Sequence, residues 1–227
     1  MSWRCSSPSG QARADSLPEA GLFHQASFTT LAIVAFVALM VLAVATRTPW
    51  LQQWDDRIEE GTGPHRARWR RIAGIASLTG EKFVHPVIGA LTAIAVLLVR
   101  HGDPFRLLLP LASASLGGIT VHHLVKFVYH RPRPEVALLR DKTEAAFPSG
   151  HTTNATAVVV TSAWILVHEG LSPLPLAVAL AVTLCLSTGA SRVVLGWHWG
   201  TDVLGGWLAG LGVASLCWWM YALLTSG

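Results

Sequence analysis

Six long stretches of this chain contain no Asp, Glu, Lys or Arg. Crossing the hydrocarbon core of a bilayer takes about 20 helical residues, and these stretches come close to that length or exceed it. Backbone groups in lipid must be hydrogen-bonded within a helix or a closed barrel, and the alternating pattern of barrel strands is absent. The sequence therefore predicts an all-α, integral membrane bundle of six transmembrane helices. The stretches are residues 28–45, 83–99, 107–125, 145–168, 170–191 and 203–227.

The overall composition supports a membrane protein. Of the 227 residues, 52% are hydrophobic and 13% are charged, whereas a typical soluble domain has about 25% charged residues. Such apolar density without heptads or a Gly-X-Y repeat excludes a disordered chain, a coiled coil and collagen. No linker divides the chain, so we predict one six-helix domain at residues 19–227, preceded by a disordered leader at residues 1–18. The three cysteines provide no disulfide framework.

The segment between the first two stretches, residues 48–80, is polar enough to leave the membrane. Its apolar side chains recur at helical spacing, first from Trp50 to Ile58 and again from Trp69 to Ala76. This pattern predicts two short amphipathic helices that lie on the membrane surface.

An even number of spans places three polar segments on the same side of the membrane. In the segment after the third stretch, Lys126 is followed by Arg133 seven residues later. A continuous helix would align the two cations, but Pro132 and Pro134 favour a turn between them. Either arrangement puts two permanent positive charges at the membrane edge.

The sequence Pro-Ser-Gly-His at residues 148–151 opens the fourth stretch. Pro148 and Gly150 suit a tight turn, and Ser149 is a residue type that caps helices. The free N–H groups at the start of a helix bind anions, so His151 would contact whatever these amides hold.

The third polar segment contains Ser191 and Arg192, followed by His198 and then Asp202. His198 and Asp202 are four residues apart, which places them on one face of a helix. There the carboxylate accepts a hydrogen bond from one ring nitrogen and leaves a lone pair on the other. An imidazole oriented in this way is a nucleophile.

Together, the side chains of the three segments suit a phosphate group. Arginine forks match phosphate oxygens, lysine adds a point charge, and both neutralise charge that spreads over these oxygens in a transition state. The sequence has no HExxH helix, no paired Cys-x-x-Cys and no Asp cluster for magnesium, so the pattern requires no metal or other cofactor.

The three segments resemble the signature of the type 2 phosphatidic-acid phosphatase superfamily. Its blocks Lys-x6-Arg-Pro, Pro-Ser-Gly-His and Ser-Arg-x5-His-x3-Asp are intact and in order from Lys126 to Asp202. The resemblance implies a membrane lipid phosphatase in which His198 attacks phosphorus and becomes phosphohistidine, held by Asp202. His151 would protonate the leaving oxygen and later activate water. The resemblance also implies phosphoryl-oxygen binding by Lys126, Arg133, Ser149, Gly150 and Arg192.

The same resemblance suggests undecaprenyl diphosphate, phosphatidylglycerol phosphate or phosphatidic acid as the substrate, and the phosphate-binding residues do not choose among these lipids. Two alternatives remain: a lipid phosphotransferase with the same intermediate, and a non-catalytic lipid-phosphate binder or transporter. The soluble vanadium haloperoxidases share this pocket, but the six apolar stretches disfavour that branch. The expected partners are a lipid phosphate and the bilayer, with no nucleic acid; the oligomeric state is not predicted.

Each motif alone also has a structural explanation. His198 and Asp202 could be a hydrogen-bonded pair at a helix start, Lys126 and Arg133 could be interfacial cations, and Ser149 could be an ordinary cap. Their occurrence together on one side of the membrane favours a common site.

Other polar residues near the motifs receive weaker assignments. We expect His122 and His123 to be structural or supporting residues, whereas His130 and Arg131 flank the two cations and are candidates for contact with substrate. A run of arginines in the second surface helix is expected to contact lipid headgroups. This run consists of Arg66, Arg68, Arg70 and Arg71.

Two arguments about orientation disagree. Of the 17 Lys and Arg residues, 13 fall on the side of the three motifs and 4 on the other, which predicts a cytoplasmic active site by the positive-inside rule. Many bacterial relatives in the resembled family work on the outer, periplasmic face of the inner membrane instead. We favour the periplasmic orientation, because cations that bind substrate and headgroups are poor topological signals.

Overall fold

The computed structural model describes residues 17–81, 83–100, 103–139 and 145–225, and every regular element in these ranges is helical. The predicted leader overlaps α1 at residues 17 and 18, and its residues 1–16 lie outside the described ranges. In chain order the α-helices are α1 (Leu17–Ala45), α2 (Pro49–Thr62), α3 (Arg66–Ala76), α4 (Val84–Arg100), α5 (Pro104–Val128), α6 (Glu135–Leu138), α7 (Gly150–His168), α8 (Leu174–Val194) and α9 (Gly200–Thr225). Two short 3₁₀ helices, η1 (Gly63–His65) and η2 (Ser77–Gly80), flank α3.

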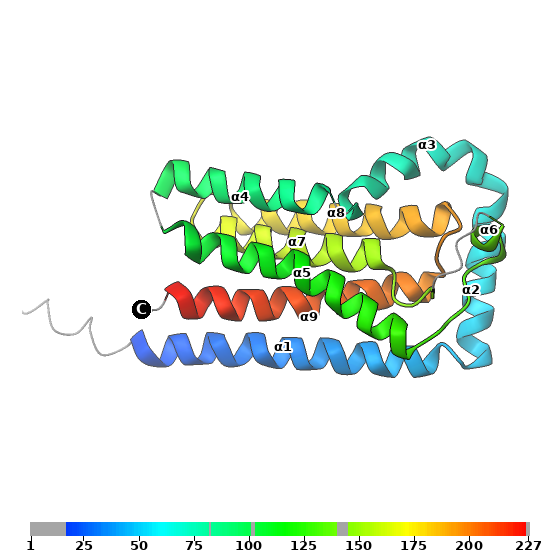
Figure 1. Cartoon of the computed structure of the whole chain (residues 1–227), viewed down its shortest axis with the longest axis horizontal. Coiled ribbons are helices and arrows are strands. Elements are labelled where there is room, and N and C mark those ends of the chain that lie inside the picture. The colour runs from blue at the N-terminus through cyan, green and yellow to red at the C-terminus, as the bar shows by residue number, and fades with distance from the viewer. Residues whose placement is uncertain (1–16, 82, 101–102, 140–144, 226–227) are drawn as a thin grey trace, which may run out of the picture.

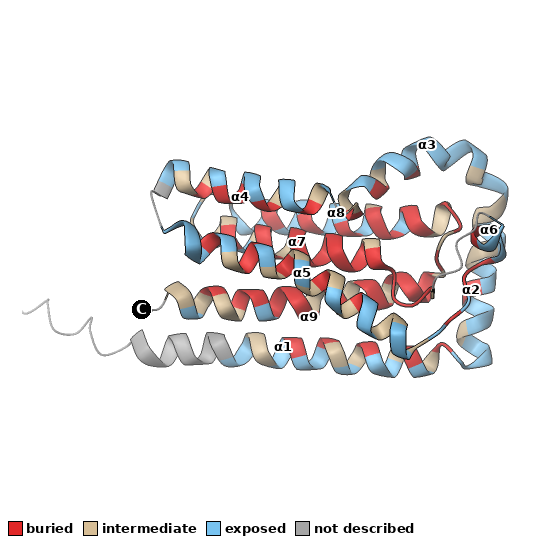
Figure 2. Ribbon diagram, viewed as in Figure 1, coloured by how far each residue is buried: buried red, intermediate tan, exposed pale blue. Residues whose placement is uncertain are grey.

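The long helices α1, α4, α5, α7, α8 and α9 run roughly side by side along the long axis of the molecule (Figure 1). α7 and α9 form its centre, because α7 packs against α4, α5, α8 and α9, while α9 also packs against α1 and α5. The buried positions are concentrated on these two helices, whereas α2 and α3 are largely exposed (Figure 2).

Small residues bring α7 and α9 into close contact. A Cβ atom added at Gly210 would lie 2.5 Å from Thr156 Cβ and 2.7 Å from the Thr153 carbonyl oxygen. Close backbone approach at small residues is typical of helix pairs in membranes. It aligns the start of α7 with the start of α9, where two of the three motifs lie.

The outer helices present large apolar side chains outward. Val41 and Val44 on α1 are 63% and 70% exposed, and Leu98 on α4 is 73% exposed. Exposed apolar surface on this scale marks contact with a partner or a membrane. The chain is therefore an integral membrane protein.

Among the described residues, four helices are long and apolar enough to cross a membrane individually: α1, α5, α8 and α9. α4 meets the same criteria only when joined to the bent segment Pro49–Gly80 that precedes it. α7 does not meet them, because it carries polar side chains such as Thr152, Thr153 and Thr161 on surfaces that face other helices. The structure thus shows a helical bundle with four or five candidate spans, and the predicted count of six is not reached by these criteria.

The two helices predicted between the first and second spans are present as α2 and α3 (Figure 1). α2 lies across one end of the bundle, where Trp54 and Ile58 pack against the start of α9 at Gly200. α3 packs against α8. Their apolar faces therefore rest partly on the bundle itself.

Candidate active site

The three motifs meet at the end of the bundle that α2 crosses (Figure 1). The backbone N–H of Ser149 donates to the carbonyl of Asp202 over 2.9 Å. Arg133 Nη1 donates to the carbonyl of Trp197 over 3.0 Å. These two hydrogen bonds join segments that are far apart along the chain.

His198 lies in the turn between α8 and α9, so the prediction that it shares a helix with Asp202 is wrong. α8 ends at Val194, and Gly196 then adopts a positive φ of 72°, a conformation that glycine adopts without steric cost. α9 begins only at Gly200. The turn nevertheless brings His198 Nδ1 to 3.5 Å from Asp202 Oδ2, and the histidine side chain is 2% exposed.

Asp202 is fully buried in the first turn of α9, and both of its oxygens are engaged. Arg131 Nη1 donates to Oδ1 over 2.8 Å, and the backbone N–H of Trp199 donates to Oδ2 over 2.9 Å. An acidic side chain that accepts from the residue preceding a helix satisfies a donor that the helix leaves free. These contacts hold the carboxylate beside His198.

Two cations of the first motif reach the site from the end of α5. The helix stops at Val128, and residues 129–134 are not helical, which confirms the predicted turn. Arg133 is 8% exposed, and its Nη1 lies 3.5 Å from His198 Nε2. Lys126 lies half-buried in the last turn of α5.

The second motif forms the start of α7. Ser149 occupies the N-cap position, but its hydroxyl accepts a hydrogen bond from the Thr152 hydroxyl over 3.0 Å and caps no backbone N–H. Gly150 lies against the ring of His122, where an added Cβ would come within 3.0 Å of the ring. In the first turn, His151 Nε2 lies 2.9 Å from Glu81 Oε1.

η2 packs against α7 and α8 beside the site, and Glu81 follows it directly. Arg192, in the last turn of α8, is 3% exposed and donates to the Ser77 hydroxyl. The hydroxyls of Thr79 and Thr188 are hydrogen-bonded. The guanidinium of Arg192 also lies 4.0 Å from the centre of the Trp197 ring. These contacts fix the third cation of the signature within the buried end of the bundle.

The surroundings of His198 keep its imidazole neutral. Burial, followed by the positive charges of Arg133, Arg192 and Lys126, holds the pKa of His198 well below its usual 6.5. The charge of His151 acts in the same direction, so side chains from all three motifs lie within electrostatic reach of His198. A neutral imidazole retains a lone pair, which is the form that attacks phosphorus.

Glu81 interacts with the other histidine of the signature. Burial raises the pKa of the Glu81 carboxyl, but the hydrogen bond to His151 and the charge of Arg192 outweigh this effect and lower it below its usual value. Glu81 is therefore an anion beside His151. The described residues include no group of three or more His, Cys, Asp or Glu side chains placed to hold a metal ion.

The structure adds two acidic residues that the sequence analysis missed, Glu81 and Asp55. Asp55 lies on α2, is 1% exposed, and accepts a hydrogen bond from Arg131 Nη2 over 2.6 Å. A sequence signal for it existed, because Asp55 follows Leu51 by four residues and precedes Ile58 by three, which places it on the apolar face of α2.

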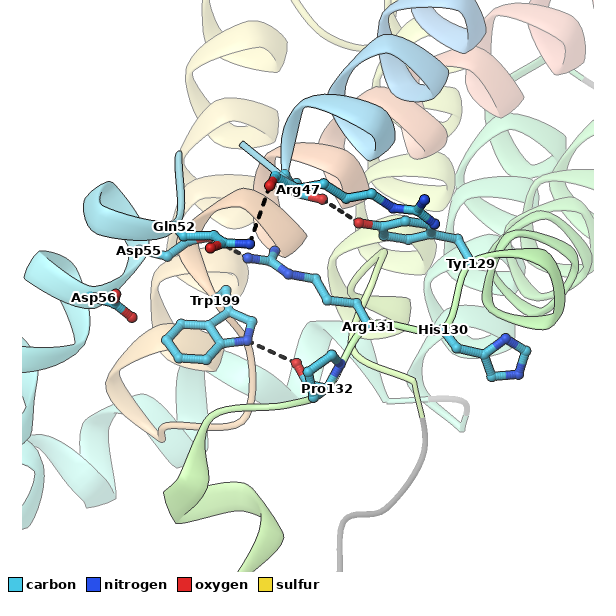
Figure 3. Close-up of a pocket in the computed structure, with 10 residues that line it drawn as sticks. Arg47, Gln52, Asp55, Asp56, Tyr129, His130, Arg131, Pro132 and Trp199 are labelled. Carbon is cyan, nitrogen blue, oxygen red and sulfur yellow. Dashed lines mark hydrogen bonds and ion pairs between the residues drawn. The ribbon is translucent and has the colours of Figure 1, made fainter. Parts of the chain in front are cut away.

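Arg131 and His130, the two candidates for contact with substrate, both line a cavity. Burial lowers the pKa of Arg131, but Asp202 and Asp55 raise it above its usual value, and the guanidinium is committed to these two carboxylates. The cavity beside it has a volume of about 330 Å³. Figure 3 shows Arg131 reaching across this cavity toward Asp55, while the exposed His130 points in a different direction. Arg131 therefore supports Asp202, and a substrate contact of His130 stays a prediction.

Comparison with known proteins places the motifs in a family context. The model of the PAP2 superfamily matches residues 106–226. Phosphatidylglycerophosphatase B of Bacillus subtilis (strain 168) is 30% identical over 185 residues, which cover 78% of this chain and 87% of that protein. Undecaprenyl-diphosphatase BcrC of the same strain is 32% identical over 121 residues, covering 51% of this chain and 58% of that protein.

The fold is also similar to a solved structure. The crystal structure of a transmembrane PAP2-type phosphatidylglycerolphosphate phosphatase from Bacillus subtilis superposes with a TM-score of 0.69 at 27% sequence identity. The similarity covers 82% of this chain and 93% of that chain. It therefore extends beyond the three motifs to the helices that carry them.

Proposed function

Since this chain belongs to the PAP2 superfamily, whose relatives named above are lipid phosphatases, we propose that it hydrolyses the terminal phosphate of a lipid phosphate or diphosphate through a phosphohistidine intermediate. The two relatives make phosphatidylglycerol phosphate and undecaprenyl diphosphate the first substrates to test, with phosphatidic acid as a third. Catalysis requires no metal or other cofactor, because arginine and lysine side chains stabilise the phosphoryl charge.

One observation carries the proposal: a buried, neutral imidazole lies between a carboxylate on one side and an arginine on the other. Nδ1 of His198 lies 3.5 Å from Asp202, and Nε2 lies 3.5 Å from Arg133. Nδ1 is thus the protonated nitrogen, and Nε2 keeps the lone pair on the side where a cation can hold a phosphoryl oxygen. The distance from Nδ1 to Asp202 is longer than a hydrogen bond, and contacts between catalytic groups are often long in the free enzyme and tighten during the reaction.

In the first step, His198 Nε2 forms a bond to phosphorus and the bond from phosphorus to the lipid oxygen breaks. Lys126, Arg133 and Arg192, with the hydroxyl of Ser149 and the backbone N–H of Gly150, stabilise the charge on the phosphoryl oxygens. His151 donates a proton to the departing lipid oxygen. Asp202 stabilises the positive charge that develops on the His198 ring.

In the second step, water attacks phosphorus and the bond to His198 breaks, releasing inorganic phosphate and restoring the neutral imidazole. His151 accepts the proton of the attacking water. Glu81 stabilises the protonated form of His151 through its 2.9 Å contact with Nε2.

We also propose that the active site lies at the membrane surface. We infer six spans formed by α1, α4, α5, α7, α8 and α9, since α7 faces other helices and needs little apolar surface. The three motifs then lie on the periplasmic face of a bacterial inner membrane.

The direct test measures phosphate release by the purified full-length protein in detergent, with a panel of the three lipid phosphates. Wild-type protein should release inorganic phosphate from at least one of them, and EDTA should leave the rate unchanged. His198→Ala should lower the rate by more than about 1,000-fold, because it removes the nucleophile.

The matched control is His65→Ala, which removes an exposed histidine of η1 outside the motifs and should retain wild-type turnover. Transfer of the phosphoryl group to another lipid without free phosphate would indicate the phosphotransferase instead. Binding of lipid phosphate without any turnover by the wild type would indicate a binder or transporter. Loss of activity in EDTA would contradict a metal-free mechanism.

A further inference from the structure

Asp55 is an acidic side chain buried where α2 crosses the end of the bundle. Its Oδ2 accepts hydrogen bonds from Arg131 Nη2 and from the Thr201 hydroxyl, both over 2.6 Å. Its Oδ1 accepts from the backbone N–H of Thr201 over 2.9 Å. All three residues are at most 9% exposed, so these contacts lie away from bulk water.

Arg131 is shared between two carboxylates. Nη2 faces Asp55, and Nη1 lies 2.8 Å from Oδ1 of Asp202. Arg131 comes from the turn after α5, Asp55 from α2 and Asp202 from α9, so three separate segments supply the cluster. Figure 3 shows the Arg131 side chain extended toward α2, with Asp55 at its end.

The charges in this cluster bear directly on His198. If Arg131 faced Asp202 alone, its positive charge would cancel the charge of that carboxylate. With Asp55 present, two negative charges surround one positive charge, and the cluster carries a net charge of −1. Opposite charges in a poorly solvated site interact strongly, so this net charge matters to a neighbouring imidazole.

We propose that Asp55 is a positioning residue that balances the charge of Arg131 and thereby leaves the charge of Asp202 available to His198. This inference rests on the proposed function. The ring of His198 becomes positively charged as Nε2 bonds to phosphorus, and Asp202 Oδ2 lies 3.5 Å from the protonated Nδ1. Asp55 thus lowers the barrier of the first step without contacting the substrate.

A purely structural role makes a different prediction. Asp55 also accepts the N–H of Thr201 at the start of α9, so its loss could simply displace that helix. A displaced helix would loosen the whole phosphate site and weaken the binding of phosphate. Loss of a negative charge near the site should instead leave phosphate affinity unchanged or increase it, because the ligand is an anion.

The test compares Asp55→Asn with wild type in full-length protein, using whichever lipid phosphate the wild type hydrolyses. Asparagine keeps an acceptor for Thr201 but loses the charge. By analogy with outer hydrogen-bond partners at metal sites, we expect kcat to fall about 10- to 100-fold. KM should change by less than about threefold, and the inhibition constant of inorganic phosphate should stay equal or decrease.

Two control variants separate charge from packing. Asp56→Asn removes the neighbouring carboxylate, which is exposed and lies apart from Arg131 in Figure 3, and should leave kcat unchanged. Thr201→Val removes the hydroxyl that donates to Asp55 and accepts from Arg131 but keeps every charge of the cluster, so kcat should stay within about threefold of wild type.

Each other outcome is informative. If Asp55→Asn shows no thermal unfolding transition, binds phosphate more weakly, or matches Asp56→Asn in kcat, the charge-balance role is overturned. A loss in Thr201→Val as large as that in Asp55→Asn overturns it as well. If the wild type releases phosphate from none of the lipids, the proposed function fails instead, and that result is recognised before any variant is compared.

Discussion

His198 combines burial with a lone pair, which is the combination a nucleophile of this kind requires. Three cations and the apolar surroundings disfavour its protonated form, while Asp202 lies beside the nitrogen that keeps its proton. The cations that hold the ring neutral are the same groups proposed to bind the phosphoryl oxygens. Binding of a phosphate anion would offset them and make positive charge on the ring more favourable during the reaction.

We expect His198 to remain unprotonated at pH 6 in the ligand-free protein. Its pKa is lowered in the folded state, whereas the unfolded chain takes up this proton near pH 6.5. Above that pH, His198 is neutral in both the folded and the unfolded state, so its protonation does not affect the stability of the fold. As the pH falls below about 6.5, His198 takes up a proton in the unfolded state but not in the folded state, which stabilises the unfolded state. The folded protein therefore loses stability with falling pH until the pH passes the pKa of His198 in the folded state.

NMR of protein labelled with ¹³C-histidine measures this protonation, and the His198→Ala variant assigns the signal. Protonation of that signal at or above pH 6.5 in the ligand-free protein would contradict the expectation. Addition of inorganic phosphate should shift the transition to higher pH, because the bound anion offsets the cations.

The motif residues could be predicted from the sequence, but their acidic partners could not. Lys126, Arg133 and Arg192 are recognisable as cations at fixed spacing. Asp55 and Glu81 are single acids in a polar segment, where a solvent-exposed position is the ordinary expectation. Helical spacing places Asp55 on the apolar face of α2, but the motif residue that each acid contacts depends on how the segment folds back on the bundle, which no local pattern encodes.

At the level of helices, the segment from α2 to Glu81 builds one side of the site. α2 supplies Asp55, η2 supplies the Ser77 hydroxyl to Arg192, and Glu81 follows at the start of the next connection. Helical spacing predicted that α2 and α3 form. It could not predict their docking, because the same apolar faces would also suit a membrane surface.

The six apolar stretches predicted the positions of the long helices well, and α7 shows why a helix at the centre of the bundle is less hydropathic than those around it. α7 packs against α4, α5, α8 and α9, and several of its buried residues are threonines, so the helix uses hydroxyls and small side chains for packing and few large apolar ones for lipid. A helix in the middle of a bundle therefore appears less apolar than one at its edge.

The close approach of η2 to α7 can be tested at Gly80. A Cβ added there would lie 2.6 Å from His151 Cβ and 2.9 Å from the His151 carbonyl oxygen, so backbone must move. We expect Gly80→Ala to destabilise the protein by about 1–3 kcal/mol and to lower turnover, because the shift displaces His151. Thermal unfolding in detergent and phosphate release measure the two effects.

Gly74→Ala is the matched control for this substitution. Gly74 lies inside α3 with nothing within 4 Å of an added Cβ, so alanine should stabilise the helix by about 0.5–1 kcal/mol and leave turnover unchanged. Equal unfolding temperatures for the two variants would show that η2 is not packed tightly on α7.

For the molecule as a whole, the pairing of its arginines bears on which end of the bundle faces outward. The positive-inside count favours a cytoplasmic site, but several of the counted cations are engaged within the protein. Arg131 is paired with two buried carboxylates, and Arg66 is paired with Glu59. Cations held in this way give weak information about the direction of membrane insertion.

We therefore expect the catalytic end to be accessible from outside intact cells. In a variant with Cys5, Cys185 and Cys217 replaced, Gln53→Cys on α2 should react with a membrane-impermeant maleimide before permeabilisation. Ser172→Cys, between α7 and α8 at the opposite end, should react only afterwards. The reverse order of labelling would assign the site to the cytoplasm.

The distance of Asp55 from the signature in sequence has a consequence for protein design. On the charge balance proposed for this residue, transplanting the three blocks into an unrelated helical scaffold would yield a pocket that binds phosphate but transfers the phosphoryl group slowly to its histidine. A designer would need to copy the crossing helix as well, because the acid that tunes the nucleophile arrives with that helix.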